Sequence, residues 1–178
     1  MARFLGAVIV SAFIFMAWGC GSSLNVSPRP MALSDLNLVQ KQQYISNAMS
    51  TLKNFRTSAL DSGSRGQFFG REELGREVKR YVELRVDPIV HDREVGEHPE
   101  TRLEVAKLQF FCSRLYFDLG EYLESWEGLR EMERRYADQP DVLQAALDPR
   151  ELGCDNLGDG IRDLKKRLFP LAFSNATP

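Results

Sequence analysis

Residues 106–136 read AKLQFFCSRLYFDLGEYLESWEGLREMERRY, and this stretch decides the fold class. Apolar side chains recur three and four residues apart on both sides of Gly120, as they do on one face of an α-helix. The residues before Gly120 predict a largely buried helix with Pro99 in its first turn, where proline is well tolerated. The residues after Gly120 predict a second helix that ends near Tyr136. The stretch therefore indicates two antiparallel helices joined by a short turn.

The same periodicity extends towards the N-terminus. A long helix is predicted from a cap at Ser34-Asp35 to about Leu60. Its inward-facing residues at heptad spacing are Leu38, Ile45, Leu52 and Ala59. A further helix is predicted over residues 72–86 and should end at Asp87-Pro88, because the residue before proline is disfavoured in the helical region. Residues 91–100, HDREVGEHPE, predict an exposed acidic loop.

Two short helical segments, 141–147 and 159–169, complete the chain, and Asp159 is the expected cap of the second. No segment has a strand pattern of comparable strength. We therefore predict an all-α fold, a helical bundle of about five to six helices with one antiparallel hairpin. It forms a single domain over residues 34–173, followed by a disordered tail at 174–178.

The hairpin resembles a single tetratricopeptide-type repeat over residues 106–140, and YFDLGEY at 116–122 carries the resemblance. In that family, small residues let the two helices approach closely. The resemblance implies close packing at Ser113, Gly120 and Ser125. No second copy lies about 34 residues away, and repeat arrays need about three copies to bury a continuous core. We therefore expect one hairpin inside a bundle.

The N-terminus has the pattern of an export signal. Arg3 precedes an apolar run, Leu5 to Trp18, that contains no ionisable side chain. The run is shorter than the roughly 20 residues of a membrane-spanning helix. With Gly19-Cys20 after it, the segment 1–23 resembles the lipobox signal peptide of bacterial lipoproteins. An ordinary signal peptide or a short uncleaved anchor are the alternatives.

The resemblance implies cleavage before Cys20, removal of residues 1–19 and attachment of palmitate-type acyl chains to the new N-terminus. Several acyl chains make membrane attachment effectively permanent, since each buried CH2 contributes about 0.8 kcal/mol. Gly21, where some lipoproteins have Asp, favours the outer membrane, with the domain facing the periplasm. Residues 20–33, rich in Ser, Gly and Pro, are then the lipidated cysteine and a flexible tether.

Charge and motifs limit the possible functions. Removal of residues 1–19 takes away Arg3 and no acidic residue, so the formal charge changes from −2 to −3. A nucleic-acid partner is not expected for such a chain. Phosphate-binding loops, dinucleotide fingerprints and serine nucleophile elbows are absent from the sequence. We expect neither a cofactor nor catalysis, and a small-molecule ligand is disfavoured.

Cys112 and Cys154 remain once Cys20 is lipidated. An oxidising compartment allows them to form a disulfide, which would stabilise the fold by roughly 4 kcal/mol. The alternative is that Cys112, among aromatic and aliphatic neighbours, is a buried free thiol.

Two segments of the sequence contain residue types that can bind metal ions. His91 and His98 lie among acidic residues, but they lack the spacing of a zinc protease, and a solvated loop is the simpler interpretation. The segment 155–160 is similar to a calcium loop, but Leu157 and Lys166 stand where oxygen ligands are required. No metal site is predicted.

Tyr122 and Trp126 are the remaining candidates for a site, either as an interface anchor or as part of the core. The function these observations favour is a non-catalytic adaptor or scaffold that is anchored to a membrane and binds another cell-envelope protein. The alternative is an envelope enzyme, or a carrier of a small ligand or metal, whose site is not visible in sequence.

Inhibition of signal peptidase II tests the anchor. We expect precursor to accumulate on an immunoblot, because this peptidase cleaves only after the cysteine is acylated. A Cys20→Ser variant should also fail to be processed. Unchanged processing and membrane association of that variant would contradict the lipoprotein assignment.

Overall fold

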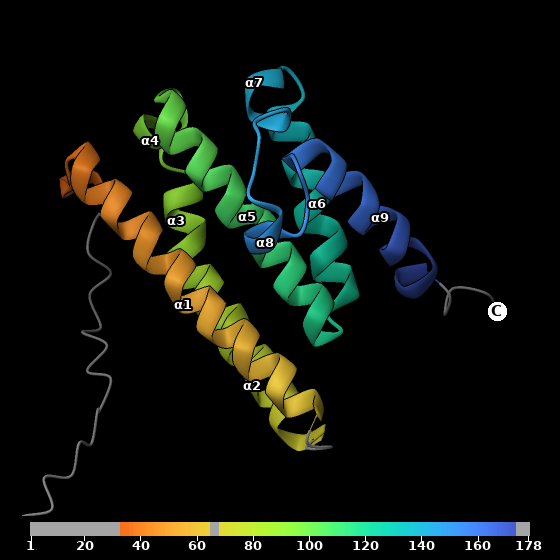
Figure 1. Ribbon diagram of the computed structural model, residues 1–178. Helices are drawn as coiled ribbons and strands as arrows, with labels where there is room; N and C mark the ends of the chain where they lie inside the picture. Colours follow the sequence, from red (N-terminus) through yellow and green to blue (C-terminus); the bar gives the residue numbers. More distant parts are fainter. Residues whose placement is uncertain (1–32, 65–67, 174–178) are drawn as a thin grey trace, which may run out of the picture. The chain divides into compact units, whose positions relative to one another are not determined.

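One helix, α5 (Pro99–Leu119), lies at the centre of the structure, a computed structural model that describes residues 33–64 and 68–173 (Figure 1). Four helices pack against it, namely α1 (Leu38–Ser64), α4 (Arg93–Glu97), α6 (Tyr122–Tyr136) and α9 (Leu157–Phe173). Its buried side chains point in every direction around its axis, and they include Leu108, Phe110, Phe111, Cys112 and Leu115. The described residues contain no strand, and the core is built by the packing of helices. The all-α prediction is therefore confirmed.

The N-terminal half consists of a short 3-10 turn, η1 (Leu33–Asp35), the long helix α1 (Leu38–Ser64) and helix α2 (Phe68–Tyr81). The predicted cap at Ser34-Asp35 is wrong, because both residues lie in η1. Asn37 caps α1 instead: its side-chain oxygen accepts from the Gln40 amide, and the Gln40 side chain accepts from the Asn37 amide, each at 2.9 Å. This reciprocal arrangement satisfies two amides at the start of the helix.

Pro88 does not end the helix that precedes it, contrary to the prediction. Helix α2 continues into a π-helical turn, η2 (Val82–Val86), and then into α3 (Asp87–Val90). Pro88 lies in the first turn of α3. A wider turn before a proline relieves the clash of its ring with the preceding turn. Val86, Ile89 and Val90 can therefore stay in the core on one continuous element.

The predicted acidic loop is partly helical. Helix α4 (Arg93–Glu97) begins at Asp92, whose side chain accepts a hydrogen bond from the Val95 amide. Asp92 also receives the Lys41 ammonium of α1 at 3.0 Å, and Glu94 binds the same ammonium at 2.6 Å. Lys41 is only 3% exposed. A buried cation thus fixes α4 onto α1.

Helices α5 and α6 (Tyr122–Tyr136) form the predicted antiparallel hairpin. Gly120 has a φ of 87°, a left-handed conformation that suits glycine at a helix end. The Ser125 hydroxyl donates to the Ser113 carbonyl at 2.7 Å, and both serines are buried. Gly128 adds to this contact, because a Cβ atom there would lie 2.5 Å from the Ser113 hydroxyl. Three small residues thus bring the two helices close together.

The C-terminal part contains two short helices, α7 (Pro140–Leu143) and α8 (Pro149–Leu152), and the longer α9 (Leu157–Phe173). The last helix is longer than predicted at both ends. Asn156 caps it by accepting from the Asp159 amide at 2.8 Å, so the prediction that Asp159 is the cap is wrong. The described residues belong to one unit, Met31–Pro178. The predicted signal peptide, Cys20, most of the predicted tether and the predicted tail at 174–178 lie outside them.

Replacement of Lys41 by Met tests the connection between α1 and α4. Removal of the ammonium leaves Asp92 largely buried without its cation, so the free energy of unfolding in urea should fall by about 2 kcal/mol at neutral pH. Arg93→Met is the matched control, since the Arg93 side chain is 91% exposed. That variant should unfold as the parent chain does.

The pH dependence gives a second measure of the same pair. Burial alone would lower the Lys41 pKa, but the hydrogen bonds that its ammonium donates to Glu94 and Asp92 raise that pKa above 10.5. Because the pKa is raised in the folded chain, the charged Lys41 contributes fully to the free energy of unfolding below the ordinary lysine pKa. That contribution is lost as the pH rises through the folded-state pKa. The stability difference between the parent chain and Lys41→Met should therefore narrow above pH 10.5. A constant difference would contradict the pairing.

Candidate functional site

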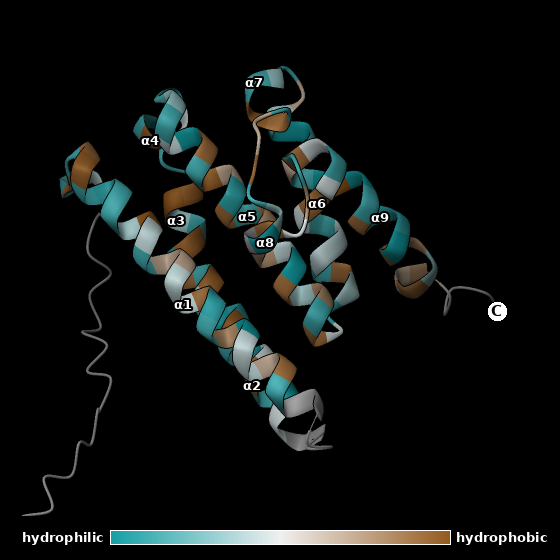
Figure 2. Ribbon diagram, viewed as in Figure 1, coloured by the Kyte–Doolittle hydropathy of each residue, from teal (hydrophilic) through white to brown (hydrophobic). Residues whose placement is uncertain are grey.

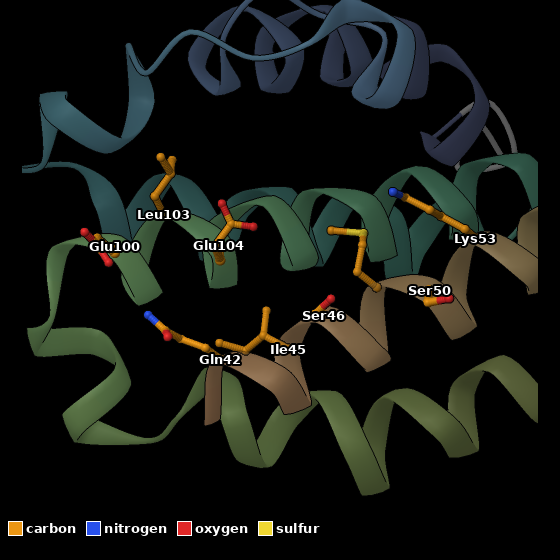
Figure 3. A pocket seen from close by; sticks show the side chains of 9 residues that line it. Gln42, Ile45, Ser46, Ser50, Lys53, Glu100, Leu103 and Glu104 are labelled. Carbon is orange, nitrogen blue, oxygen red and sulfur yellow. The ribbon is translucent and has the colours of Figure 1, made fainter. Parts of the chain in front are cut away.

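A long groove runs between α1 and α5, and Figure 3 shows side chains from both helices that line it. Its volume is about 620 Å³, within the range of protein ligand sites. The lining residues are Gln42, Ile45, Ser46, Met49, Ser50 and Lys53 from α1, with Glu100, Leu103 and Glu104 from α5.

The groove has an apolar floor and a polar rim. Ile45 is buried and Met49 and Leu103 are half-buried, so these three supply the apolar surface. Ser46 and Ser50 are exposed one turn apart and offer hydroxyl groups that donate or accept hydrogen bonds. Such a lining suits a ligand with both apolar and hydrogen-bonding groups.

A second hollow of about 460 Å³ continues the groove along α1. Lys53 borders both hollows. The second is lined by Lys53, Arg56, Thr57, Leu60, Phe111, Asp148 and Arg150. From Gln42 to Leu60 the helix advances roughly 27 Å. The two hollows together therefore form an elongated depression, with acidic residues at the Glu100 end and mainly basic residues at the other.

A separate group of aromatic side chains lies where α6 meets the end of α9. The Trp126 ring lies 5.3 Å from the Phe173 ring and 6.2 Å from the Phe169 ring, and the two Phe rings are 5.7 Å apart. The Lys165 ammonium lies over the Trp126 ring at 4.9 Å and also pairs with Glu133 at 2.6 Å. We call Trp126, Phe169 and Phe173 the aromatic surface.

The two predicted interface residues have different surroundings. Trp126 is half-buried in the aromatic surface, whereas Tyr122 packs against Phe117, with ring centroids 5.9 Å apart. The sequence reading missed Phe169 and Phe173. A signal for them exists, because Lys165, Phe169 and Phe173 follow one another at intervals of four residues on α9. Their face is distinct from the buried one, which carries Leu157, Ile161, Leu164 and Leu168.

The predicted disulfide between Cys112 and Cys154 is not formed, and both cysteines are free. Cys112 is buried near Val86, on the side of α5 that faces η2. Cys154 instead lies beside Phe110 and Arg114. Residues 110 and 114 occupy the face of α5 opposite to residue 112, because each residue advances about 100° around a helix. The body of α5 therefore separates the two thiols.

The histidines do not converge. The Nδ1 atom of His91 lies 2.8 Å from the Asp87 carbonyl, and His98 precedes α5 with its Nδ1 buried and without a hydrogen-bond partner. No group of three or more acidic, histidine or cysteine side chains in the described ranges could hold a metal ion. In the segment similar to a calcium loop, Asn156 and Asp159 bond to each other at 2.6 Å as part of the α9 cap.

None of the helices within residues 33–64 and 68–173 is both long and apolar enough to cross a membrane. This finding leaves the lipid anchor at Cys20 as a prediction, since that residue lies outside the described part. The chain matches no family model, no curated protein and no solved structure. The resemblance of the α5–α6 hairpin to a tetratricopeptide-type repeat likewise stays a prediction.

Thiol labelling of the chain from Gly21 onwards tests the state of the cysteines. Burial raises the pKa of Cys112 far above its ordinary value, and burial also raises the pKa of Cys154. The reactive thiolate is therefore scarce at both positions. We expect slow labelling of the half-buried Cys154 in the native chain and labelling of Cys112 only after unfolding. A Cys154→Ala variant should take up no label in its native state. A native mass lower by two hydrogen atoms, with a cross-linked 112–154 peptide, would contradict free thiols.

Proposed function

We propose that this chain is a membrane-anchored lipoprotein that acts as a non-catalytic adaptor for another cell-envelope protein. The α1–α5 groove supports this proposal, and we assign to it one occupant: an extended segment of the partner protein. The anchor proposed at Cys20 would keep the groove at the membrane. The adaptor would thus hold its partner at that surface.

The shape of the groove favours a chain segment over a small molecule. The two hollows are open along their length and extend for roughly 27 Å beside α1. An extended chain advances about 3.3 Å per residue, so about eight residues would fill that length. Ser46, Ser50 and Thr57 recur along the same side of α1, where they can bond to the main chain of such a segment.

The charge distribution favours one direction for the bound segment. Glu100 and Glu104 lie at one end of the groove, and Lys53 and Arg150 lie towards the other. A segment with a basic residue at its first end and an acidic residue at its second would be complementary to both. Complementary charges set the register of binding and its rate more than its strength. Apolar side chains inserted between Met49 and Leu103 would supply most of the affinity.

A photo-activatable amino acid at Ser50 tests this assignment in intact cells. Ser50 is exposed and lines the groove, so we expect it to cross-link to one envelope protein through one short peptide of that protein. The same amino acid at Asn54 is the matched control. Asn54 is also exposed, lies one turn along α1 and lines neither hollow.

Filling the groove gives the second half of the test. A Ser50→Trp variant should lose the cross-link introduced at Ser46 and reduce the affinity for a synthetic copy of the captured peptide at least tenfold. An Asn54→Trp variant should retain both. The proposal is wrong if the captured peptide binds the Ser50→Trp variant as tightly as the parent chain. It is also wrong if cross-linking at Ser50 yields no protein.

A further inference from the structure

We infer that the aromatic surface is a second membrane contact, which places the end of α9 in the interface of an anionic phospholipid bilayer. The inference deepens the proposed lipoprotein role by adding an attachment site within the folded domain. The residues of the aromatic surface differ from those of the α1–α5 groove. An experiment can therefore disprove the membrane contact without disproving the peptide binding of the groove, and the reverse.

Large apolar side chains are unusually exposed at this end of the domain. Phe169 is 61% exposed and Phe173 is 40% exposed, although both lie on a helix whose opposite face is buried. Leu123 on α6, one turn before Trp126, is also exposed. Figure 2 shows hydrophobic residues at the C-terminal end of α9. Apolar side chains grouped in this way mark a surface that is covered in use.

A run of cationic residues on α9 precedes Phe169 and Phe173 in the sequence. Lys165, Lys166 and Arg167 form an uninterrupted basic run that ends two residues before Phe169, and no acidic residue follows Asp163 in α9. Lys166 and Arg167 are exposed. Each cation near an anionic lipid surface strengthens binding about fivefold. The charge of this helix end is therefore complementary to acidic phospholipid headgroups.

The combination of residues favours lipid over a protein partner. Phe and Leu side chains beside Lys and Arg are typical of helices that lie in a membrane interface, where rings enter the acyl boundary and ammonium groups reach the headgroups. Trp126 suits the same depth, because indole has an apolar ring and a polar N–H. Residues 21–33 can span at most roughly 45 Å, so a lipid-anchored domain would never be far from the bilayer.

Trp126 reports directly on this contact. It is the only tryptophan in the chain that begins at Gly21, and that chain retains every residue of the described core. We expect vesicles of phosphatidylethanolamine and phosphatidylglycerol to shift its emission to shorter wavelength. Lipids brominated near the headgroup should quench it. Vesicles of phosphatidylcholine alone should bind at least tenfold more weakly. Because this chain carries no acyl group, the result does not depend on lipidation.

Matched variants connect the binding to the aromatic surface. Phe169→Ser combined with Phe173→Ser should weaken vesicle binding at least tenfold, and Lys166→Gln should weaken it about fivefold. Leu84→Ser is the control, because Leu84 is 50% exposed on η2 and lies apart from the aromatic surface. It should bind as the parent chain does. Circular dichroism and urea unfolding would verify that each variant is folded.

Two outcomes would overturn the inference. One is that anionic vesicles neither shift nor quench the emission of Trp126. The other is that the double Phe variant binds vesicles as well as the Leu84→Ser control. If the parent chain bound no vesicles and the double Phe variant lost a protein partner, the aromatic surface would be a protein-binding surface and not a membrane contact. A Ser50→Trp variant should bind vesicles normally, which separates this result from a failure of the groove.

Discussion

The burial of the middle of α5 on all sides is the constraint on which the rest of the structure depends. Between Val105 and Leu115, buried residues lie on every side of the helix axis, so each neighbour must match a different strip of the helix surface. On one strip, Ser113 allows α6 to approach closely through Ser125 and Gly128. On another, Phe111 lies beneath the Arg56 guanidinium of α1 at 5.8 Å.

The fold class could be predicted because helical periodicity is a property of the sequence alone. The hairpin around Gly120 is the clearest example, since apolar residues recur on both sides of a residue suited to a left-handed turn. Helix ends were less predictable. Asn37 and Asn156, not Ser34-Asp35 and Asp159, cap their helices, because neighbouring polar residues compete for the same amides. Pro88 was misread because a π-helical turn, which sequence does not signal, absorbs its clash.

The candidate sites depend on which faces of different helices meet, and that information is not local. Trp126 was identified from its residue type, but its companions Phe169 and Phe173 lie more than 40 residues further along the chain, on a different helix. The error over Cys112 and Cys154 has the same origin. A count of cysteines suggests a pair, whereas the angular position of residue 112 on α5 points its thiol away from Cys154. The groove needed both α1 and α5 in place before it could be recognised.

The two proposed contacts are compatible because they use different sides of α5. Helix α1 forms one wall of the groove, while α6 and the end of α9 form the aromatic surface (Figure 1). A domain held at its N-terminus by lipid alone would turn freely on a flexible tether. A second attachment through α9 would restrict that rotation and give the groove a defined orientation to the membrane. Restricting orientation raises the effective concentration of the groove for a partner in the same membrane, without any new contact to that partner.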